Sequence, residues 1–121
     1  MTKASVTMDV RKVDDRTSVI AVQGEINAFA ENVLMDAYTQ ASSYGATNII
    51  LDFSGLSYMN SSGIGLLVTL LIRANRQKQR LLAAGLSEHY RQIFDLTRLN
   101  EAIAIYSTEE EALAAVGSPV H

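Results

Sequence analysis

Residues 52–66 read DFSGLSYMNSSGIGL, and this stretch joins a short apolar segment to a long apolar run. The segment before it, residues 48–53, predicts a buried strand, and the run after it predicts a helix from about Ser62 to Gln77. We expect a polar turn between the two. Ser61 and Ser62 then stand at a helix start, where four backbone N–H groups have no partner within the helix. Such a position favours an anion such as phosphate.

The size and composition of the chain exclude several classes of protein. Its 121 residues suit one domain, residues 1–121, and 48% of them are hydrophobic, which is enough for a core. The net charge is −3, and no face is dominated by basic residues, which argues against a nucleic-acid binder. The chain has no cysteine and two histidines, which argues against disulfides, thiolate catalysis and a structural zinc site. We therefore expect no metal and no cofactor of its own.

Hydropathy argues against insertion into a membrane. The longest nearly apolar run covers residues 64–72, whereas a membrane-spanning helix needs about 20 apolar residues. This run therefore predicts a core helix. The N-terminal residues are followed by no hydrophobic region of the kind found in signal peptides. We expect a cytoplasmic protein.

Hydrophobic periodicity predicts alternating strands and helices. Residues 5–11 alternate strictly, and with residues 17–23 they predict an antiparallel hairpin around the turn at residues 14–16. Residues 24–27 then turn into a helix that Asn27 caps and Gly45 ends. Its apolar stripe consists of Ala30, Leu34, Ala37 and Ala41. Further strands are expected at residues 48–53, 80–84 and 102–106, and further helices at residues 62–77, 87–96 and 108–116.

This order predicts an α/β fold with a mixed sheet of four or five strands and about four helices. The last helix opens with a capping box, Thr108 to Glu111. We expect residues 116–121 to form a flexible tail.

Several features near the two serines have ordinary structural explanations. One of the serines can simply cap the helix. Gly63 and Gly65 lack the third glycine of a dinucleotide-binding loop, because Val68 occupies its place, so we expect both glycines to pack the helix closely against the sheet. Tyr58 is a core residue by default, or else an exposed anchor beside the serines. The cluster Arg73, Arg76, Lys78 and Arg80 is either a solvated helix end or a contact for an acidic partner.

A serine hydrolase is the remote alternative from the enzyme class. The nucleophile elbow of such enzymes needs glycine two residues before and two residues after the serine. Ser61 has Met59 before it, so the pattern is incomplete. The available bases, His89 and His121, are both expected on the surface.

Six short segments in order resemble the STAS domain family, and bacterial anti-sigma factor antagonists in particular. In that family, the first serine of an Asp-Ser-Ser-Gly-Leu-Gly loop is phosphorylated by a partner. Asn60 stands here in place of the loop aspartate, and Asn27 in place of the aspartate of the family's Gly-Glu-Leu-Asp turn. The matching segments are residues 24–27, 51–56, 60–65, 85–87, 96–99 and 107–113.

The resemblance implies a binding switch and not an enzyme, with no catalytic residue of its own. The unphosphorylated antagonist binds an anti-sigma factor, often a GHKL-type serine kinase, and thereby frees a sigma factor. The kinase uses Mg-ATP to phosphorylate the loop serine, and the complex then dissociates. A PPM-type serine phosphatase restores the binding form. Ser61 is the implied phosphorylation site, with Ser62 as the second choice.

The resemblance also implies a partner surface made of two segments. Its residues are Glu25, Ile26, Asn27, Ala28, Tyr58, Met59, Asn60, Ser61, Ser62, Gly63 and Ile64. Two alternatives share the fold: a scaffold subunit of a stress-sensing complex, and a STAS subunit of a lipid-transport ABC complex.

Overall fold

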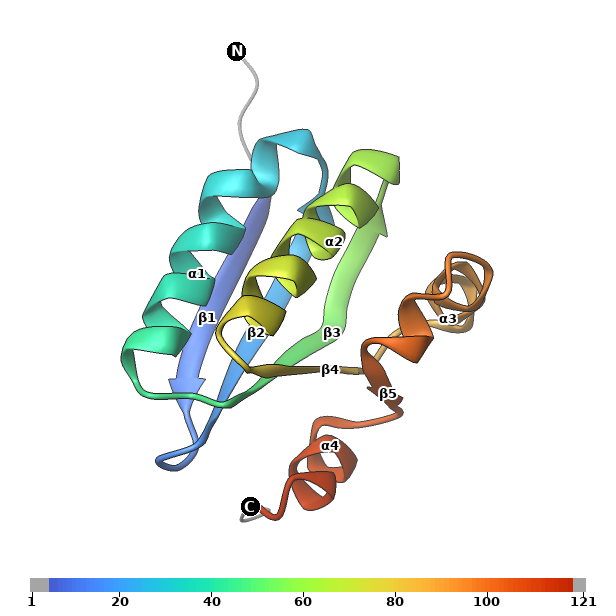
Figure 1. Ribbon diagram of the computed structural model, residues 1–121. Coiled ribbons are helices and arrows are strands. Elements are labelled where there is room, and N and C mark those ends of the chain that lie inside the picture. Colours follow the sequence, from blue (N-terminus) through green and yellow to red (C-terminus); the bar gives the residue numbers. More distant parts are fainter. Residues whose placement is uncertain (1–4, 119–121) are drawn as a thin grey trace.

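The computed structural model describes residues 5–118, which form one mixed sheet with helices packed on both faces (Figure 1). The α/β architecture expected from the sequence, with four or five strands and about four helices, is therefore confirmed. The strands are β1 (Val6–Lys12), β2 (Thr17–Ile26), β3 (Asn48–Met59), β4 (Arg80–Ala84) and β5 (Ala104–Tyr106). The helices are α1 (Glu31–Ser43), α2 (Ser61–Arg76), α3 (Glu88–Leu96) and α4 (Glu109–Ala115), with short 3-10 helices η1 (Ala28–Ala30) and η2 (Leu99–Glu101).

The sheet has the strand order β1-β2-β3-β4-β5. The hairpin pair β1 and β2 is antiparallel, as expected, and every later neighbour is parallel. Parallel neighbours follow from the strand–helix–strand connections, because each helix returns the chain to the same end of the sheet. The carboxyl ends of β2 and β3 consequently lie side by side at one end of the molecule.

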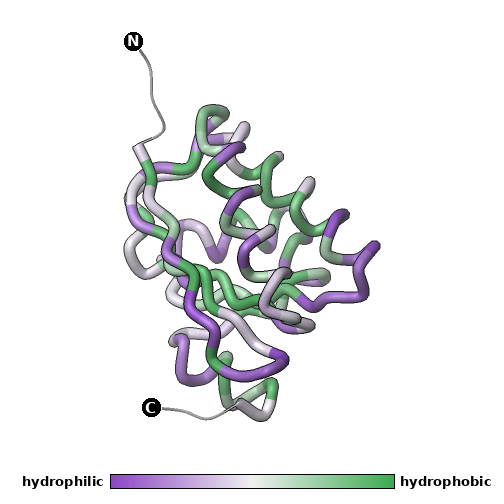
Figure 2. The backbone as a smooth tube through the Cα atoms, turned by 90° about the vertical axis from the view of Figure 1, so that its left-hand side faces the viewer, coloured by the Kyte–Doolittle hydropathy of each residue, from purple (hydrophilic) through white to green (hydrophobic). Residues whose placement is uncertain are grey.

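The central strands are apolar on both faces. Ile20, Ile49 and Leu81 contribute to the larger cluster beneath α1, α2 and α3. Val19, Ile50 and Leu82 alternate with them and pack against Ala112 and Leu113 of α4 on the opposite face. Figure 2 shows these strands as hydrophobic segments running beside the helices. The stripe expected for α1, namely Ala30, Leu34, Ala37 and Ala41, is buried as predicted.

The polar turn expected after Phe53 is absent, because β3 continues to Met59. The β2–β3 register shifts twice, between Ala21 and Gln23 and between Gly24 and Glu25, so β3 carries extra residues relative to β2. Such bulges break the period-two pattern that marks a strand in a sequence. The turn expected at residues 24–27 is likewise mostly strand, since β2 ends at Ile26.

Ser118 packs beside the β1–β2 turn, within the stretch of residues 116–121 that was expected to form a flexible tail. Ser118 is buried, and its hydroxyl donates to Asp14 Oδ2 at 2.8 Å and lies 2.9 Å from Thr17 Oγ1. Residues 119–121 lie outside the described part of the chain. Within residues 5–118, no helix combines the length and the hydrophobicity needed to cross a membrane.

Candidate functional site

The structure brings the two segments of the expected partner surface together at the ends of β2 and β3. Glu25 pairs with Tyr58 and Ile26 with Met59 across the parallel strands. The N–H of Asn60 then donates to the carbonyl oxygen of Ile26 at 3.3 Å. Residues far apart in the chain therefore form one continuous surface around Ser61.

Asn60 caps α2, so neither serine does. Its backbone is extended (φ −93°, ψ −176°), and its Oδ1 accepts a hydrogen bond from the N–H of Gly63 at 3.0 Å. Asparagine caps helices about as well as aspartate. The replacement of the family's aspartate thus preserves the cap while it removes a negative charge from the start of the helix. The helix accordingly begins at Ser61, one residue earlier than predicted.

Ser61 and Ser62 occupy the first two positions of α2, and both are exposed. Within residues 5–118, neither hydroxyl makes a hydrogen bond to another protein group. The first turn of α2 contains no acidic residue. Both hydroxyls are therefore free to react, at a helix end whose partial charge is positive.

Asn27 has a matching structural role in the other segment. It precedes η1, and its Oδ1 accepts a hydrogen bond from the N–H of Phe29 at 2.9 Å. The cap predicted at Asn27 is confirmed, although it begins the 3-10 turn that leads into α1. Both departures from the family's aspartates are therefore compatible with the local backbone.

Gly63 packs α2 against the sheet, as predicted. A Cβ atom at this position would lie 2.4 Å from the carbonyl oxygen of Ile26 and 2.7 Å from Cγ of Met59. No larger residue fits there without a shift of the helix. The same prediction is wrong for Gly65, where a Cβ atom would meet nothing within 4 Å.

The eleven residues expected at the partner surface differ in exposure. Ile26, Met59 and Gly63 are buried, so these three residues lie beneath the surface and are not exposed on it. Tyr58 is 51% exposed, which decides between the two structural expectations for this residue in favour of exposure. The other exposed members are Glu25, Ala28, Ser61 and Ser62, and Asn27, Asn60 and Ile64 are half-buried.

Tyr90 of α3 supports the site from a segment that sequence reasoning did not include. Its hydroxyl accepts a hydrogen bond from the N–H of Met59 at 2.8 Å, and the residue is 6% exposed. β4 pairs with β3 only as far as Asp52, so a side chain satisfies this buried donor where no strand is present. No sequence pattern around Tyr90 indicates that its hydroxyl forms this hydrogen bond.

Within the described part of the chain, no catalytic base or metal-binding cluster is joined to the two serines. His89 is exposed and stacks edge-on against the ring of Tyr90, and within residues 5–118 no base forms a hydrogen bond with either serine. His121 lies outside the described residues. Over residues 5–118, no three histidine, aspartate or glutamate side chains gather as they would around a metal ion.

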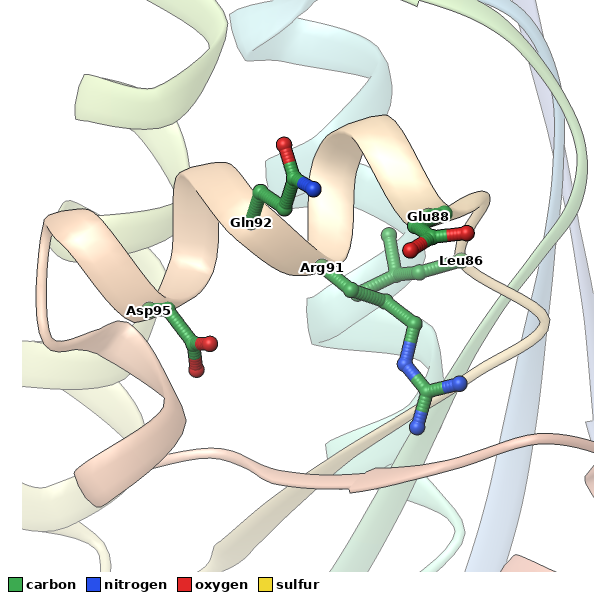
Figure 3. A pocket seen from close by; sticks show the side chains of 5 residues that line it. All are labelled: Leu86, Glu88, Arg91, Gln92 and Asp95. Atoms are coloured by element: carbon green, nitrogen blue, oxygen red, sulfur yellow. The ribbon is translucent and has the colours of Figure 1, made fainter.

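A surface depression of about 510 Å³ lies on the outer side of α3. Figure 3 shows its lining, in which Glu88, Arg91, Gln92 and Asp95 come from α3 and Leu86 from the segment just before that helix. These side chains are exposed apart from Leu86, and no ion pair among the described residues joins them. The depression is open and charged, unlike the largely apolar pockets that bind small molecules.

Comparison with known proteins supports the resemblance seen in the sequence. A family model for the STAS domain matches residues 8–112. The anti-sigma-B factor antagonist of Staphylococcus aureus (strain NCTC 8325 / PS 47) is 26% identical over 91 residues, covering 75% of this chain and 84% of the relative. The anti-sigma-B factor antagonist of Listeria monocytogenes is 25% identical over 107 residues, covering 88% of this chain and 94% of the relative.

Solved structures show the same fold. The anti-sigma factor antagonist SpoIIAA in its unphosphorylated form superposes with a TM-score of 0.72 and 27% identity, covering 92% of this chain and 98% of SpoIIAA. The phosphorylated form of this Bacillus cell fate determinant gives a TM-score of 0.71 and 29% identity, covering 91% and 99%.

Proposed function

This chain belongs to the STAS domain family, and we propose that it is a cytoplasmic anti-sigma factor antagonist switched by phosphorylation of Ser61. The unphosphorylated form binds an anti-sigma factor that is also a GHKL-type serine kinase. Phosphorylation with Mg-ATP releases the complex, and a PPM-type phosphatase reverses the modification. The chain itself is a binding switch with no catalytic residue. The observation that carries this proposal is the free, exposed hydroxyl of Ser61 at the first position of α2.

The helix geometry favours Ser61 over Ser62. Successive residues of an α-helix are about 100° apart. Gly63, Leu67, Leu70 and Ala74 are the buried residues of α2, and they define its inner face. Ser61 lies nearly opposite the centre of that face, whereas Ser62 lies toward the side. A kinase approaching from solvent therefore meets Ser61 first.

A phosphate at Ser61 can change binding without a rearrangement of the domain. Phosphorylation adds about −1.5 to −2 charges at neutral pH. The N-terminus of α2 carries a partial positive charge, so a phosphate on Ser61 is compatible with the fold of the antagonist. A partner surface that is apolar or acidic does not, and a 100-fold loss of affinity needs only about 2.8 kcal/mol. The proposed switch thus acts locally, through the surface that contains Ser61.

Binding of serine variants tests the proposal. Ser61→Ala and Ser61→Asp serve as baits in extracts of the cells that make this protein, and proteins retained only by Ser61→Ala are identified and purified. Calorimetry should then show tight binding to Ser61→Ala and at least 100-fold weaker binding to Ser61→Asp. Ser57→Asp is the matched control, because Ser57 is an exposed serine in the preceding strand. Equal affinity of one partner kinase for Ser61→Asp and the native chain would contradict the proposal.

A further inference from the structure

The end of the molecule where β2, β3 and β4 begin is strongly basic. Figure 1 shows the β1–β2 turn, the end of α2 and the start of β4 together at this end, away from the end at which α2 begins. Five exposed basic residues belong to these segments, and we call them the basic end: Arg16, Arg73, Arg76, Lys78 and Arg80. They are five of the ten lysines and arginines in a chain whose net charge is −3. The fold therefore concentrates positive charge that the composition does not reveal.

Backbone hydrogen bonds place the basic residues of different segments near one another. The carbonyl oxygen of Arg16 accepts a hydrogen bond from the N–H of Thr47 at 2.8 Å. The carbonyl oxygen of Thr47 in turn accepts one from the N–H of Arg80 at 2.7 Å. Arg16 and Arg80 thus flank a single residue, although they are far apart in the sequence.

The charge of the basic end is not neutralised by neighbouring acidic groups. Among residues 5–118, none of its five side chains forms an ion pair. The two aspartates of the β1–β2 turn have other partners. Asp14 accepts a hydrogen bond from the Ser118 hydroxyl at 2.8 Å, and Asp15 lies 3.6 Å from the ammonium group of Lys12. The five cations are therefore available to an anionic partner.

The turn that carries Lys78 is fixed in a conformation that suits glycine better. Lys78 has φ 57°, in the left-handed region, where an ordinary side chain is strained. The adjacent Gln79 is buried, and its Nε2 donates to the carbonyl oxygen of Ala46 at 3.1 Å. Gln79 Oε1 also accepts a hydrogen bond from the Tyr38 hydroxyl at 2.6 Å. These contacts hold the turn in place, and a lysine at its strained position points to a function for that side chain.

Exposed apolar and aromatic side chains adjoin the basic end. Ile72 is 48% exposed, and Arg76 follows it by four residues, so the two are neighbours on the surface of α2. Tyr44 is 37% exposed at the end of α1. The next residue, Gly45, lies against the β1–β2 turn, since a Cβ atom there would be 3.6 Å from the carbonyl oxygen of Asp15. Apolar and aromatic groups among long cationic side chains are typical of surfaces that meet lipid headgroups.

The kind of anion that fits the basic end follows from the backbone there. Both α1 and α2 end at this side of the molecule, so their free backbone groups are carbonyl oxygens with a partial negative charge. A single phosphate is held best by backbone N–H groups at a helix start, which this end does not present for either helix. Long cationic side chains from separate segments suit an extended anionic surface instead. A nucleic acid is such a surface, but its phosphate backbone gives no apolar environment to Ile72 and Tyr44, whereas a lipid surface does.

We propose that the basic end binds the headgroups of an anionic phospholipid membrane, with Ile72 and Tyr44 at the headgroup level. The contact is peripheral, and it goes beyond the proposed function without depending on it. Each lysine or arginine near an anionic surface strengthens binding about fivefold, so five are enough for reversible attachment. Ser61 and Arg76 stand at opposite ends of α2, about 22 Å apart along the helix axis. The surface around Ser61 is therefore directed away from the membrane.

Sedimentation with lipid vesicles tests the inference. The native chain should bind vesicles of equal parts phosphatidylcholine and phosphatidylglycerol at low salt, leave them as the ionic strength rises, and ignore vesicles of phosphatidylcholine alone. Arg76→Gln combined with Lys78→Gln should bind at least about 10-fold more weakly. The matched control combines Arg91→Gln with Arg98→Gln, which also replaces an exposed helix arginine and a basic residue with positive φ. Equal losses in the two double variants, equal binding to both kinds of vesicle, or no binding would overturn the inference.

Tryptophan fluorescence tests how the chain is oriented on the vesicle. The native chain has no tryptophan, so a single introduced one reports on its own surroundings. The emission of Ile72→Trp should shift to shorter wavelength when the anionic vesicles are added, because indole prefers the membrane interface. Leu96→Trp is the control, since Leu96 is 85% exposed on α3, and its emission should not change. A shift at position 96 alone, or at neither position, would overturn the inference.

Duplex DNA of random sequence is titrated in parallel at the same ionic strength. Binding to this DNA without binding to the vesicles would assign the basic end to nucleic acid and overturn the inference. Ser61→Asp should bind the vesicles as the native chain does. Because no partner protein is present in these measurements, failure of the proposed phosphorylation switch would leave their outcome unchanged.

Discussion

The hydroxyl of Tyr90 on α3 accepts a hydrogen bond from the backbone N–H of Met59, with the two atoms 2.8 Å apart. Met59 directly precedes the cap residue Asn60, so α3 holds the strand end that positions Ser61. Figure 1 shows α3 beyond β3, on the side where that strand has no neighbouring strand at its end. The hydrogen bond gives the Met59 N–H an acceptor seven residues beyond Asp52, where pairing of β3 with β4 ends.

Tyr90→Phe should therefore destabilise both the fold and the site. The change leaves the buried N–H of Met59 without an acceptor, which costs about 1–3 kcal/mol of unfolding free energy. Urea denaturation measures that cost, and amide hydrogen exchange should become faster at Met59 and Asn60. Tyr44→Phe is the control, because the Tyr44 hydroxyl also accepts a hydrogen bond, but at an exposed position. Unchanged exchange at both amides in Tyr90→Phe would show that this hydrogen bond does not hold the strand end.

Gly63→Ala should lower the unfolding free energy by about 1–3 kcal/mol, because a methyl group at this position overlaps the carbonyl oxygen of Ile26. Gly65→Ala provides a matched comparison on the same helix, since a methyl group there meets nothing. Chemical denaturation of both variants is the measurement. Equal changes in stability for the two would mean that the packing beneath Gly63 relaxes freely.

Ser18→Ala should stabilise the fold. Ser18 is fully buried, and its Oγ is the buried side-chain oxygen without a hydrogen-bond partner in the described part of the chain. Removing an unpaired buried hydroxyl should raise the unfolding free energy by about 1 kcal/mol. Thermal and urea unfolding test this. A loss of stability would indicate that the hydroxyl has a partner, such as a buried water molecule.

Asp14 should contribute to stability in a pH-dependent way. The pKa of its carboxyl group is lowered, first by the backbone N–H of Arg16 and then by the hydroxyl of Ser118. Because the pKa is lower in the folded state, the stabilisation is fully present above the unfolded-state pKa of about 3.9. It is then lost as the pH falls through the lower folded-state value.

Urea denaturation between about pH 5 and pH 2 measures this contribution of Asp14. Asp14→Asn should lose stability less steeply than the native chain over this acidic range. Ser118→Ala should behave partly like Asp14→Asn, because it removes one of the groups that lower the pKa. Parallel curves for all three proteins would show that Asp14 titrates in the folded state as it does in the unfolded chain.

Local sequence signals were sufficient for the order and type of the elements. The apolar runs of β3 and β4, the stripe of α1 and the cap of α4 are each patterns that can be read within a few neighbouring residues. The end of β3 was misread because its two bulges place Ser54, Gly55 and Ser57 within a strand, where their types normally indicate a turn.

The sequence by itself determined an α/β domain of the STAS type with Ser61 at the start of a helix, because strand and helix periods and short motifs are properties of neighbouring residues. Only the tertiary structure decided which residues surround that serine. Asn60, and neither serine, caps α2. Gly63 is needed for close packing of α2 on the sheet, whereas Gly65 is not. Tyr90, 31 residues away in the sequence, forms a hydrogen bond with Met59. These outcomes depend on how β2, β3 and α3 pack against one another, and packing between remote segments cannot be predicted from a local sequence pattern.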